Sequence, residues 1–248
     1  MDKYRIKPGC RPSLSRFDPD DTGVYKKNDA GKAKAKTAAA KFIAQLDQVQ
    51  ERLYANKTRA LLIILQGMDT SGKDGTIKHV MSGVNPQGCR VASFKAPSEK
   101  ELEQDFLWRI HQEVPPKGYI GIFNRSQYED VLITRVHGLV SKKVVTQRFN
   151  QITEFEELLV ENGTAIIKLF LHISKDEQKE RLTERIRDPE KRWKFSEGDV
   201  EERKMWDDYR TSWRRPAPSG LPGTSCRPIA NGIAISWWQS WWYTRLLP

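Results

Sequence analysis

Short apolar runs recur along the chain and predict buried strands. Each of them has the length of a strand and is bounded by glycine, proline or charged residues. They are Ala60–Gln66, Arg90–Phe94, Gly118–Phe123 and Ala165–Leu171. Mainly apolar runs, as opposed to alternating ones, are typical of strands that are buried on both faces of a parallel sheet.

Helical patterns lie between these strands. Within residues 31–56, Phe42, Leu46, Val49 and Leu53 recur at helical spacing, and the polar face is rich in lysine. Further helices are expected at Thr76–Ser82, Glu99–His111 and Val144–Glu161. Strands that alternate with helices predict an α/β fold of three layers, in which a parallel sheet carries helices on both faces.

The two ends of the chain depart from this pattern. Residues 1–30 carry proline, glycine, aspartate and lysine without a period, which predicts an irregular N-terminal arm before a domain at 31–209. From Tyr209 onward there is no aspartate, glutamate or lysine, yet there are five tryptophans and five prolines. A packed domain seldom changes composition so sharply, so residues 210–248 are predicted to be an aberrant tail.

The net charge limits the classes of molecule that the protein is expected to bind. The 248 residues include 42 basic and 32 acidic ones, a net charge of +10. Such a surplus indicates a polyanionic partner, whether nucleic acid, anionic membrane, nucleotide or phosphate chain, although solubility alone also explains it. Cys10, Cys89 and Cys226 are odd in number and far apart, which argues against a disulfide framework or a zinc site. No leader or membrane-spanning run is seen, so a cytoplasmic protein is expected.

The stretch "LLIILQGMDTSGKDGTIKHV", residues 61–80, carries the strongest chemical signal. A strand that enters a glycine-rich turn and then a helix surrounds one point with backbone N–H groups and the positive helix end. Lys73 reaches further along a phosphate chain, so the stretch predicts a P-loop, with a generic strand–turn–helix as the alternative. The expected phosphate-binding residues are Gly67, Met68, Thr70, Ser71, Gly72, Lys73, Asp74 and Gly75.

One position departs from the usual P-loop. Asp74 stands where the magnesium-holding serine or threonine normally follows the lysine, and Thr76 lies further on. Asp69, inside the loop, becomes the candidate for organising a metal ion or the attacking oxygen. A carboxylate beside phosphates is costly unless it binds a cation or a proton, which favours a functional role.

A second candidate site follows the third strand, in "GYIGIFNRSQYEDV". Ligands of open α/β sheets sit at the carboxyl ends of strands, which places Asn124, Arg125, Tyr128 and Glu129 near the P-loop. Arg125 is suited to neutralise charge in a phosphoryl-transfer transition state. The alternative is a polar turn without a ligand.

A third candidate is a helical lid at about residues 175–205. This segment is rich in basic residues, and two aromatic residues, Trp193 and Phe195, lie between them. Pro189 and Gly198 interrupt the helical pattern, as in a movable flap. The basic residues are Arg181, Arg185, Lys191, Arg192 and Lys194. A lid that closes over phosphates excludes water, although a solvated charged helix is the alternative. Together these features predict a P-loop kinase-like fold with a helical lid.

These residues resemble the polyphosphate kinase 2 family, in particular its class III members. The motifs that carry the resemblance are "GMDTSGKDGTIKHVMSGVNPQG", "FKAPS", "GYIGIFNRSQYEDVL" and "DPEKRWKFSEGDVEERKMWDDY", and it covers about residues 1–209. It implies reversible, Mg²⁺-dependent transfer of a phosphoryl group from inorganic polyphosphate to nucleoside mono- and diphosphates (AMP and ADP, GMP and GDP). Mn²⁺ is a second candidate metal. It also implies a homodimer or homotetramer, with neither nucleic acid nor membrane as partner.

The resemblance also implies roles for single residues. Lys73 and the loop amides would hold phosphates, Asp69 would sit at the acceptor phosphate and its magnesium ion, and Arg125 would bridge donor and acceptor. Asn124 stands where other classes have aspartate, which leaves a second acidic metal ligand in doubt. The lid residues would be Arg181, Arg185, Lys191 and Lys194. The polyphosphate guides would be Lys78 and the lysine-rich helix after Lys32. No catalytic histidine is required, so His79, His111, His137 and His172 are interpreted as structural.

The tail has a second possible reading. The family continues after "WDDY" with a segment similar to "STEWAPWYVVPANRKWYRN". Codons that encode Gly223–Trp238 also permit W-Y-V-V-P-A-N-R-K-W-Y-R-N-L-V in another frame, in which tryptophan pairs become valine codons. We therefore expect a frameshift near Arg210. The alternative is a genuine lineage-specific tail.

Loss of the family segment would expose a sheet edge and leave the chain prone to aggregation and weak or inactive. Two other functions remain open: an ATP-dependent nucleoside monophosphate kinase, and a non-catalytic polyphosphate-binding protein if the tail abolishes turnover.

Overall fold

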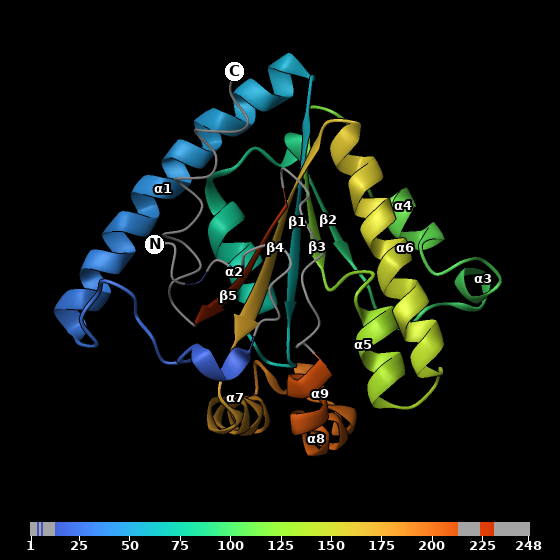
Figure 1. Ribbon diagram of the computed structural model, residues 1–248. Coiled ribbons are helices and arrows are strands. Elements are labelled where there is room, and N and C mark those ends of the chain that lie inside the picture. The colour runs from blue at the N-terminus through green and yellow to red at the C-terminus, as the bar shows by residue number, and fades with distance from the viewer. Residues whose placement is uncertain (1–3, 5, 7–12, 213–223, 231–248) are drawn as a thin grey trace.

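A parallel five-stranded sheet in the order β2-β3-β1-β4-β5 forms the centre of the protein (Figure 1). The computed structural model describes residues 4, 6, 13–212 and 224–230. The strands are β1 (Ala60–Gly67), β2 (Cys89–Ser93), β3 (Ile120–Asn124), β4 (Thr164–His172) and β5 (Thr224–Ala230). The first four begin and end within about two residues of the predicted runs, and the three-layer α/β fold is confirmed.

Helices cover both faces of the sheet and also lie beyond the carboxyl ends of its strands (Figure 1). On one face lie α1 (Asp29–Asn56) and α2 (Lys73–Val80). On the other lie α4 (Trp108–Gln112), α5 (Glu129–Val136) and α6 (Lys142–Glu161), with the short α3 (Glu99–Leu102) further out. Beyond the carboxyl ends of the strands lie α7 (Lys175–Arg187), α8 (Glu197–Lys204) and α9 (Trp206–Ser212). Helices α7 and α8 make up the predicted lid, residues 175–205, and are placed to cover the loops at these strand ends.

Alternate side chains of β1 enter two different cores, which is why this strand is apolar at almost every position. Leu61 and Ile63 pack with residues of α1 and α2, whereas Leu62 and Ile64 pack with Phe155 of α6. All four β1 side chains are at most 1% exposed. Burying each contributes about 1.5–3 kcal/mol, which holds the end of β1 rigidly in the middle of the sheet.

The segment Glu99–His111, predicted as one helix, is two. The first turn, α3, is capped by Ser98, whose side chain accepts from Glu101 N while the Glu101 carboxylate accepts from Ser98 N. The chain then leaves the helix, and the Asp105 carboxylate accepts from Leu107 N just before α4 begins. Local side-chain bonds to the backbone compete here with helix continuation, which a helical period alone does not reveal. Helix α5 was not predicted.

The prediction of an unpaired edge strand is wrong for β4. Strand β5 pairs with β4 in parallel register, from Ile166↔Thr224 to His172↔Ala230. Most of the predicted aberrant tail, residues 213–223 and 231–248, lies outside the described residues, so the frameshift remains a prediction. In the described part of the N-terminal arm, one short 3-10 helix, Leu14–Arg16, precedes α1.

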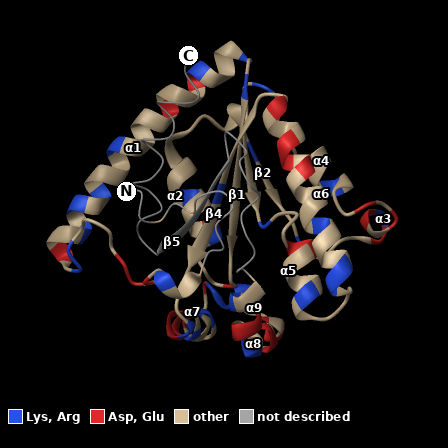
Figure 2. Ribbon diagram, viewed as in Figure 1, with Lys and Arg blue, Asp and Glu red and all other residues tan. Residues whose placement is uncertain are grey.

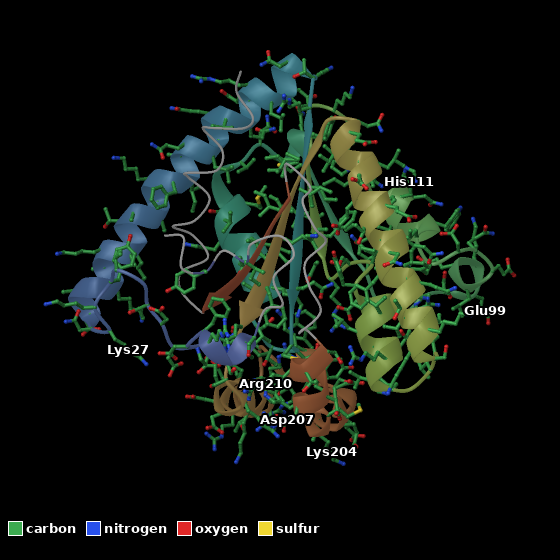
Figure 3. The ribbon with its side chains drawn as sticks, in the orientation of Figure 1. Lys27, Glu99, His111, Lys204, Asp207 and Arg210 are labelled. Carbon is green, nitrogen blue, oxygen red and sulfur yellow. The ribbon has the colours of Figure 1, made fainter. Side chains whose placement is uncertain are left out.

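Charged side chains are distributed unevenly over these elements. Basic residues lie along the length of α1, whereas basic and acidic residues lie close together on α7 and α8 (Figure 2). His111 lies on α4, far from these lid helices, and its ring meets Phe155 edge-on with centroids 5.4 Å apart (Figure 3). No helix within the described ranges has the length and apolar composition needed to cross a bilayer.

Candidate active site

The loop between β1 and α2 has the backbone of a phosphate cradle. Thr70 and Gly72 adopt left-handed conformations, with φ of 63° and 92°. Gly72 accepts the first helical bond of α2, from Thr76 N at 2.9 Å. A Cβ atom on Gly67 would lie 2.6 Å from Ser71 Oγ, so this turn requires glycine. The N-terminal end of α2 therefore meets the loop at the carboxyl edge of the sheet, as predicted.

Lys73 lies inside this loop. Its Nζ donates to the carbonyl oxygens of Gly67 at 2.8 Å and Met68 at 3.1 Å, and its side chain is only 8% exposed. Burial lowers the pKa of Lys73, and the nearby Asp69 carboxylate opposes that effect. The arrangement holds an ammonium group beneath the position where loop amides would bind a phosphate.

Arg125 reaches the loop from the end of β3. Its Nη2 lies 2.6 Å from Asp69 Oδ1, and its Nη1 lies 3.5 Å from Glu129 Oε2. Burial alone would lower the pKa of Arg125, but the carboxylates of Asp69 and Glu129 raise it overall. Its backbone is left-handed, with φ of 65°, and its N–H donates to Leu65 O on β1. A strained residue tied to the neighbouring strand thus points a fixed positive charge at Asp69.

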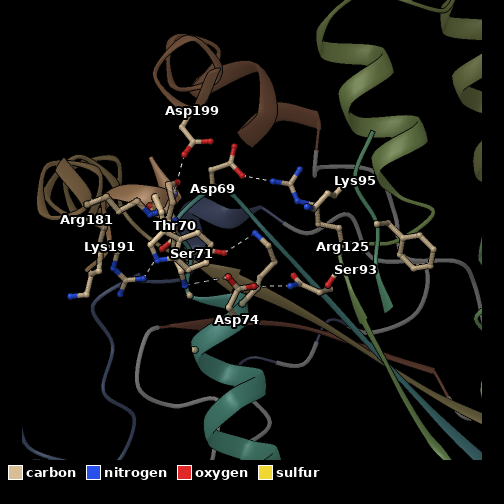
Figure 4. A pocket seen from close by; sticks show the side chains of 18 of the residues that line it. Asp69, Thr70, Ser71, Asp74, Ser93, Lys95, Arg125, Arg181, Lys191 and Asp199 are labelled. Atoms are coloured by element: carbon tan, nitrogen blue, oxygen red, sulfur yellow. Dashed lines mark hydrogen bonds and ion pairs between the residues drawn. The ribbon is translucent and has the colours of Figure 1, made fainter. Parts of the chain in front are cut away.

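Two cavities meet at this ion pair. The larger has a volume of about 730 Å³ and the smaller about 230 Å³, and both are lined by Asp69, Arg125 and Asp199. Figure 4 shows the larger cavity. Seven basic and four acidic residues line the larger cavity. The smaller has one basic residue, Arg125, and four acidic ones, Asp69, Glu129, Asp199 and Glu202. Oppositely charged cavities therefore share one centre.

The lid supplies part of the larger cavity. All four predicted lid residues line it: Arg181, Arg185, Lys191 and Lys194. Arg185 Nη1 lies 2.9 Å from Asp199 Oδ2, which joins α7 to α8. Lys194 Nζ lies 3.8 Å from Asp74 Oδ2, which joins the lid to α2. The structure therefore brings the lid against the phosphate loop, as expected for a flap over phosphates.

Two predicted site residues line neither cavity. The hydroxyl of Tyr128 donates to Glu156 Oε1 at 2.9 Å, inside the layer between β4 and α6. Lys78 is exposed on α2. Tyr128 thus has a packing role, because the turn after Arg125 directs it into the core. Asn124 does line the larger cavity, where its Nδ2 donates to Asp74 Oδ1 at 2.7 Å.

Lys95 and Asp199 are among the residues of the two cavities that the sequence did not predict. Lys95 lines the larger cavity just beyond the end of β2, where the rule of strand carboxyl ends could have found it in "FKAPS". Asp199 lines both cavities from the first turn of α8. Burial raises its pKa, and so does the like charge of Asp69. Only the folding of the lid over the loop reveals this residue.

The donor set fits a magnesium ion. No group of three or more histidine, cysteine or acidic residues is arranged to hold a metal in the part of the chain that the structure describes. Magnesium, however, is commonly held by only one or two carboxylates together with substrate phosphates. Asp69 and Asp199 line the same cavity as the phosphate loop. Of these, Asp69 would hold the ion.

Comparison with known proteins identifies the family. The profile of Polyphosphate kinase 2 (PPK2) matches residues 27–215. The chain is similar to an AMP/ADP-polyphosphate phosphotransferase of Meiothermus ruber, at 53% identity over 213 residues that cover 86% of this chain and 79% of the relative. It is also similar to an ADP-polyphosphate phosphotransferase of Rhodopseudomonas palustris, at 49% identity over 225 residues that cover 86% and 76%. A crystal structure of Polyphosphate Kinase 2 from Arthrobacter aurescens TC1 superimposes with a TM-score of 0.85 at 40% identity, covering 97% of this chain and 83% of that one. The chain therefore belongs to the polyphosphate kinase 2 family.

Proposed function

We propose that this chain transfers a phosphoryl group from inorganic polyphosphate to AMP and ADP. The observation that carries the proposal is the meeting of a basic and an acidic cavity at one ion pair, Asp69–Arg125. The names of the relatives from Meiothermus ruber and Rhodopseudomonas palustris support the same reaction.

The charges of the cavities support an assignment of the two substrates. A chain with about one negative charge per phosphate suits the larger cavity, where lysine and arginine predominate. The smaller cavity repels a polyanion but suits an uncharged nucleoside, whose hydroxyl and amino groups donate to carboxylates such as Glu202. The acceptor phosphate would then meet the donor between Asp69 and Arg125.

The chemistry requires positioning more than proton transfer. An oxygen of the acceptor phosphate, already ionised, forms the new bond to the terminal phosphorus of polyphosphate. The bridging P–O bond breaks, and its electrons remain on the shortened chain. Lys73 and the loop amides hold the donor, and Arg125 offsets the charge that develops between donor and acceptor. Bound Mg²⁺, or Mn²⁺, would neutralise phosphate charge beside Asp69.

Finer features of the proposal come from the class III resemblance. GMP and GDP would also serve as acceptors, the reaction would run in both directions, and the protein would form a homodimer or homotetramer. The histidines have no part in the transfer, since the attacking oxygen needs no general base.

A donor-by-acceptor panel tests the proposal. Polyphosphate and ATP are each offered as donor, with AMP, ADP, GMP and GDP as acceptors, to this chain and to its Lys73→Ala variant. We expect product from polyphosphate and none above background from the variant. Product from ATP alone would establish the nucleoside monophosphate kinase instead. Polyphosphate binding without any product would establish a binding protein.

A further inference from the structure

Side chains hold four consecutive carbonyl oxygens of the phosphate loop. Lys73 holds the first two. The next two are held from α7, since Gln178 Nε2 donates to Asp69 O at 3.1 Å and Arg181 Nη1 donates to Thr70 O at 2.8 Å. Carbonyl oxygens that are engaged in this way leave the amides of a loop to face an anion. Helix α7 is therefore part of the cradle as well as of the lid.

The amide of Gln178 can bridge its two partners in only one orientation. Its Oε1 accepts from Arg203 Nη1 of α8 at 3.0 Å, and Arg203 is further anchored to Lys175 O at 2.6 Å. A guanidinium only donates and the Asp69 carbonyl only accepts, so the amide nitrogen must face Asp69. Gln178 borders the smaller cavity but is only 1% exposed, so water cannot replace either bond at low cost.

We propose that Gln178 is a positioning residue for Asp69, and that Arg203 of the lid holds it in its donating orientation. The carboxylate of Asp69 meets Arg125 between the two cavities, so a shift of its backbone would misplace the group that the reaction depends on. The docking of α8 against α7 thus also fixes the conformation of the phosphate loop. This inference rests on the proposed function for its kinetic readout.

Two substitutions separate this role from simple packing. Gln178→Glu keeps an acceptor for Arg203 but has no N–H for Asp69 O, whereas Gln178→Leu loses both bonds. Gln50→Leu is the matched control, because Gln50 is equally buried at 1% exposure, lies on α1 and lines neither cavity. Both variants lack the hydrogen bond to Asp69 O, so we expect each to lower kcat about tenfold, with KM for polyphosphate changed less than about twofold.

Amide hydrogen exchange provides a readout that does not need turnover. In both Gln178 variants of the full chain, the peptide that covers residues 61–80 should exchange faster, whereas Gln50→Leu should leave it unchanged. Wild-type kcat and exchange in Gln178→Glu would overturn the inference. A wild type that stays inactive when its reading frame is restored would count against the proposed function, while the exchange data would still decide the positioning role. If the Gln178 variants do not fold, Arg203→Met, which leaves the amide free to turn, should still raise loop exchange, and unchanged exchange there would overturn the inference.

Discussion

Three charged side chains from three segments make up the proposed transfer centre. Lys73 opens α2, Asp69 lies in the loop before it, and Arg125 follows β3. Because β1 and β3 are adjacent and parallel, their carboxyl ends bring these residues together. The relative positions of these three side chains therefore depend on the pairing of the strands.

Loss of the Lys73 ammonium should remove most turnover. Lys73→Ala deletes the charge beneath the loop and leaves the carbonyl oxygens of Gly67 and Met68 without their donor. We expect kcat with polyphosphate to fall at least about a hundredfold. Lys117→Ala is the control, since Lys117 is exposed just before β3, at the opposite edge of the sheet. Equal losses in the two variants would contradict the assignment.

Glu129 makes stability depend on pH. Burial raises its pKa, and the charges of Arg125 and Lys73 only partly oppose this. Since the folded chain keeps Glu129 protonated to a higher pH than the unfolded chain does, its ionisation costs stability as pH rises above the ordinary carboxyl pKa.

Glu129→Gln should therefore raise Tm near pH 7 by about 2 °C, and the gain should vanish near pH 3, where the carboxyl is protonated in both states. Thermal melts at the two pH values, with the exposed Glu157→Gln as control, measure this. A lower Tm near pH 7, or a gain that does not depend on pH, would refute it.

At the level of elements, a buried ion pair joins β4 to α6. Lys168 Nζ lies 2.5 Å from Glu156 Oε2, with side chains 8% and 0% exposed. Glu156 also accepts from Gln127 and Tyr128, which follow Arg125 in the chain. The pair therefore anchors the turn that follows Arg125.

Lys168→Met should destabilise the fold by about 3–5 kcal/mol, because it leaves the Glu156 carboxylate buried without its cation. Replacing both partners, as Lys168→Met with Glu156→Leu, should recover most of that loss. Urea unfolding of the two single variants and the double variant gives the coupling. Additive losses would show that the pair contributes no interaction of its own.

The same elements show how far the sequence could predict the molecule. Apolar runs located β1 to β4, the P-loop motif located Asp69 and Lys73, and the rule of strand ends located Arg125 and Asn124. Helix α5 was missed because its eight residues give too few helical turns for a period to be recognised. Tyr128 and Asp199 required tertiary information, since the direction of a turn and the docking of a lid decide where their side chains lie.

At the level of the whole molecule, the sequence of the C-terminal segment should decide how stable and how active the protein is. Strand β5 covers the edge of β4 with Thr224, Ser225 and Cys226 in its first half. The other reading frame would place Tyr-Val-Val at these positions, which are stronger strand formers. The chain with its frame restored should therefore melt at a higher temperature and turn over faster than the chain as it stands.

Sequencing the coding DNA tests the frameshift directly, because codons that do not permit the second reading would exclude it. Parallel melts and assays of the two chains test the physical consequence. Equal melting temperatures and equal kcat would show that the tail is a functional part of this protein. Light scattering on both chains tests the expected dimer or tetramer.

The most direct test of the central claim follows the phosphoryl group itself. Radiolabelled polyphosphate and unlabelled ADP are incubated with Mg²⁺ and the chain with its frame restored, and the nucleotides are separated. We expect the label to enter ATP, and Lys73→Ala to prevent this. Label that stays in the polymer, or is released only as orthophosphate, would contradict it.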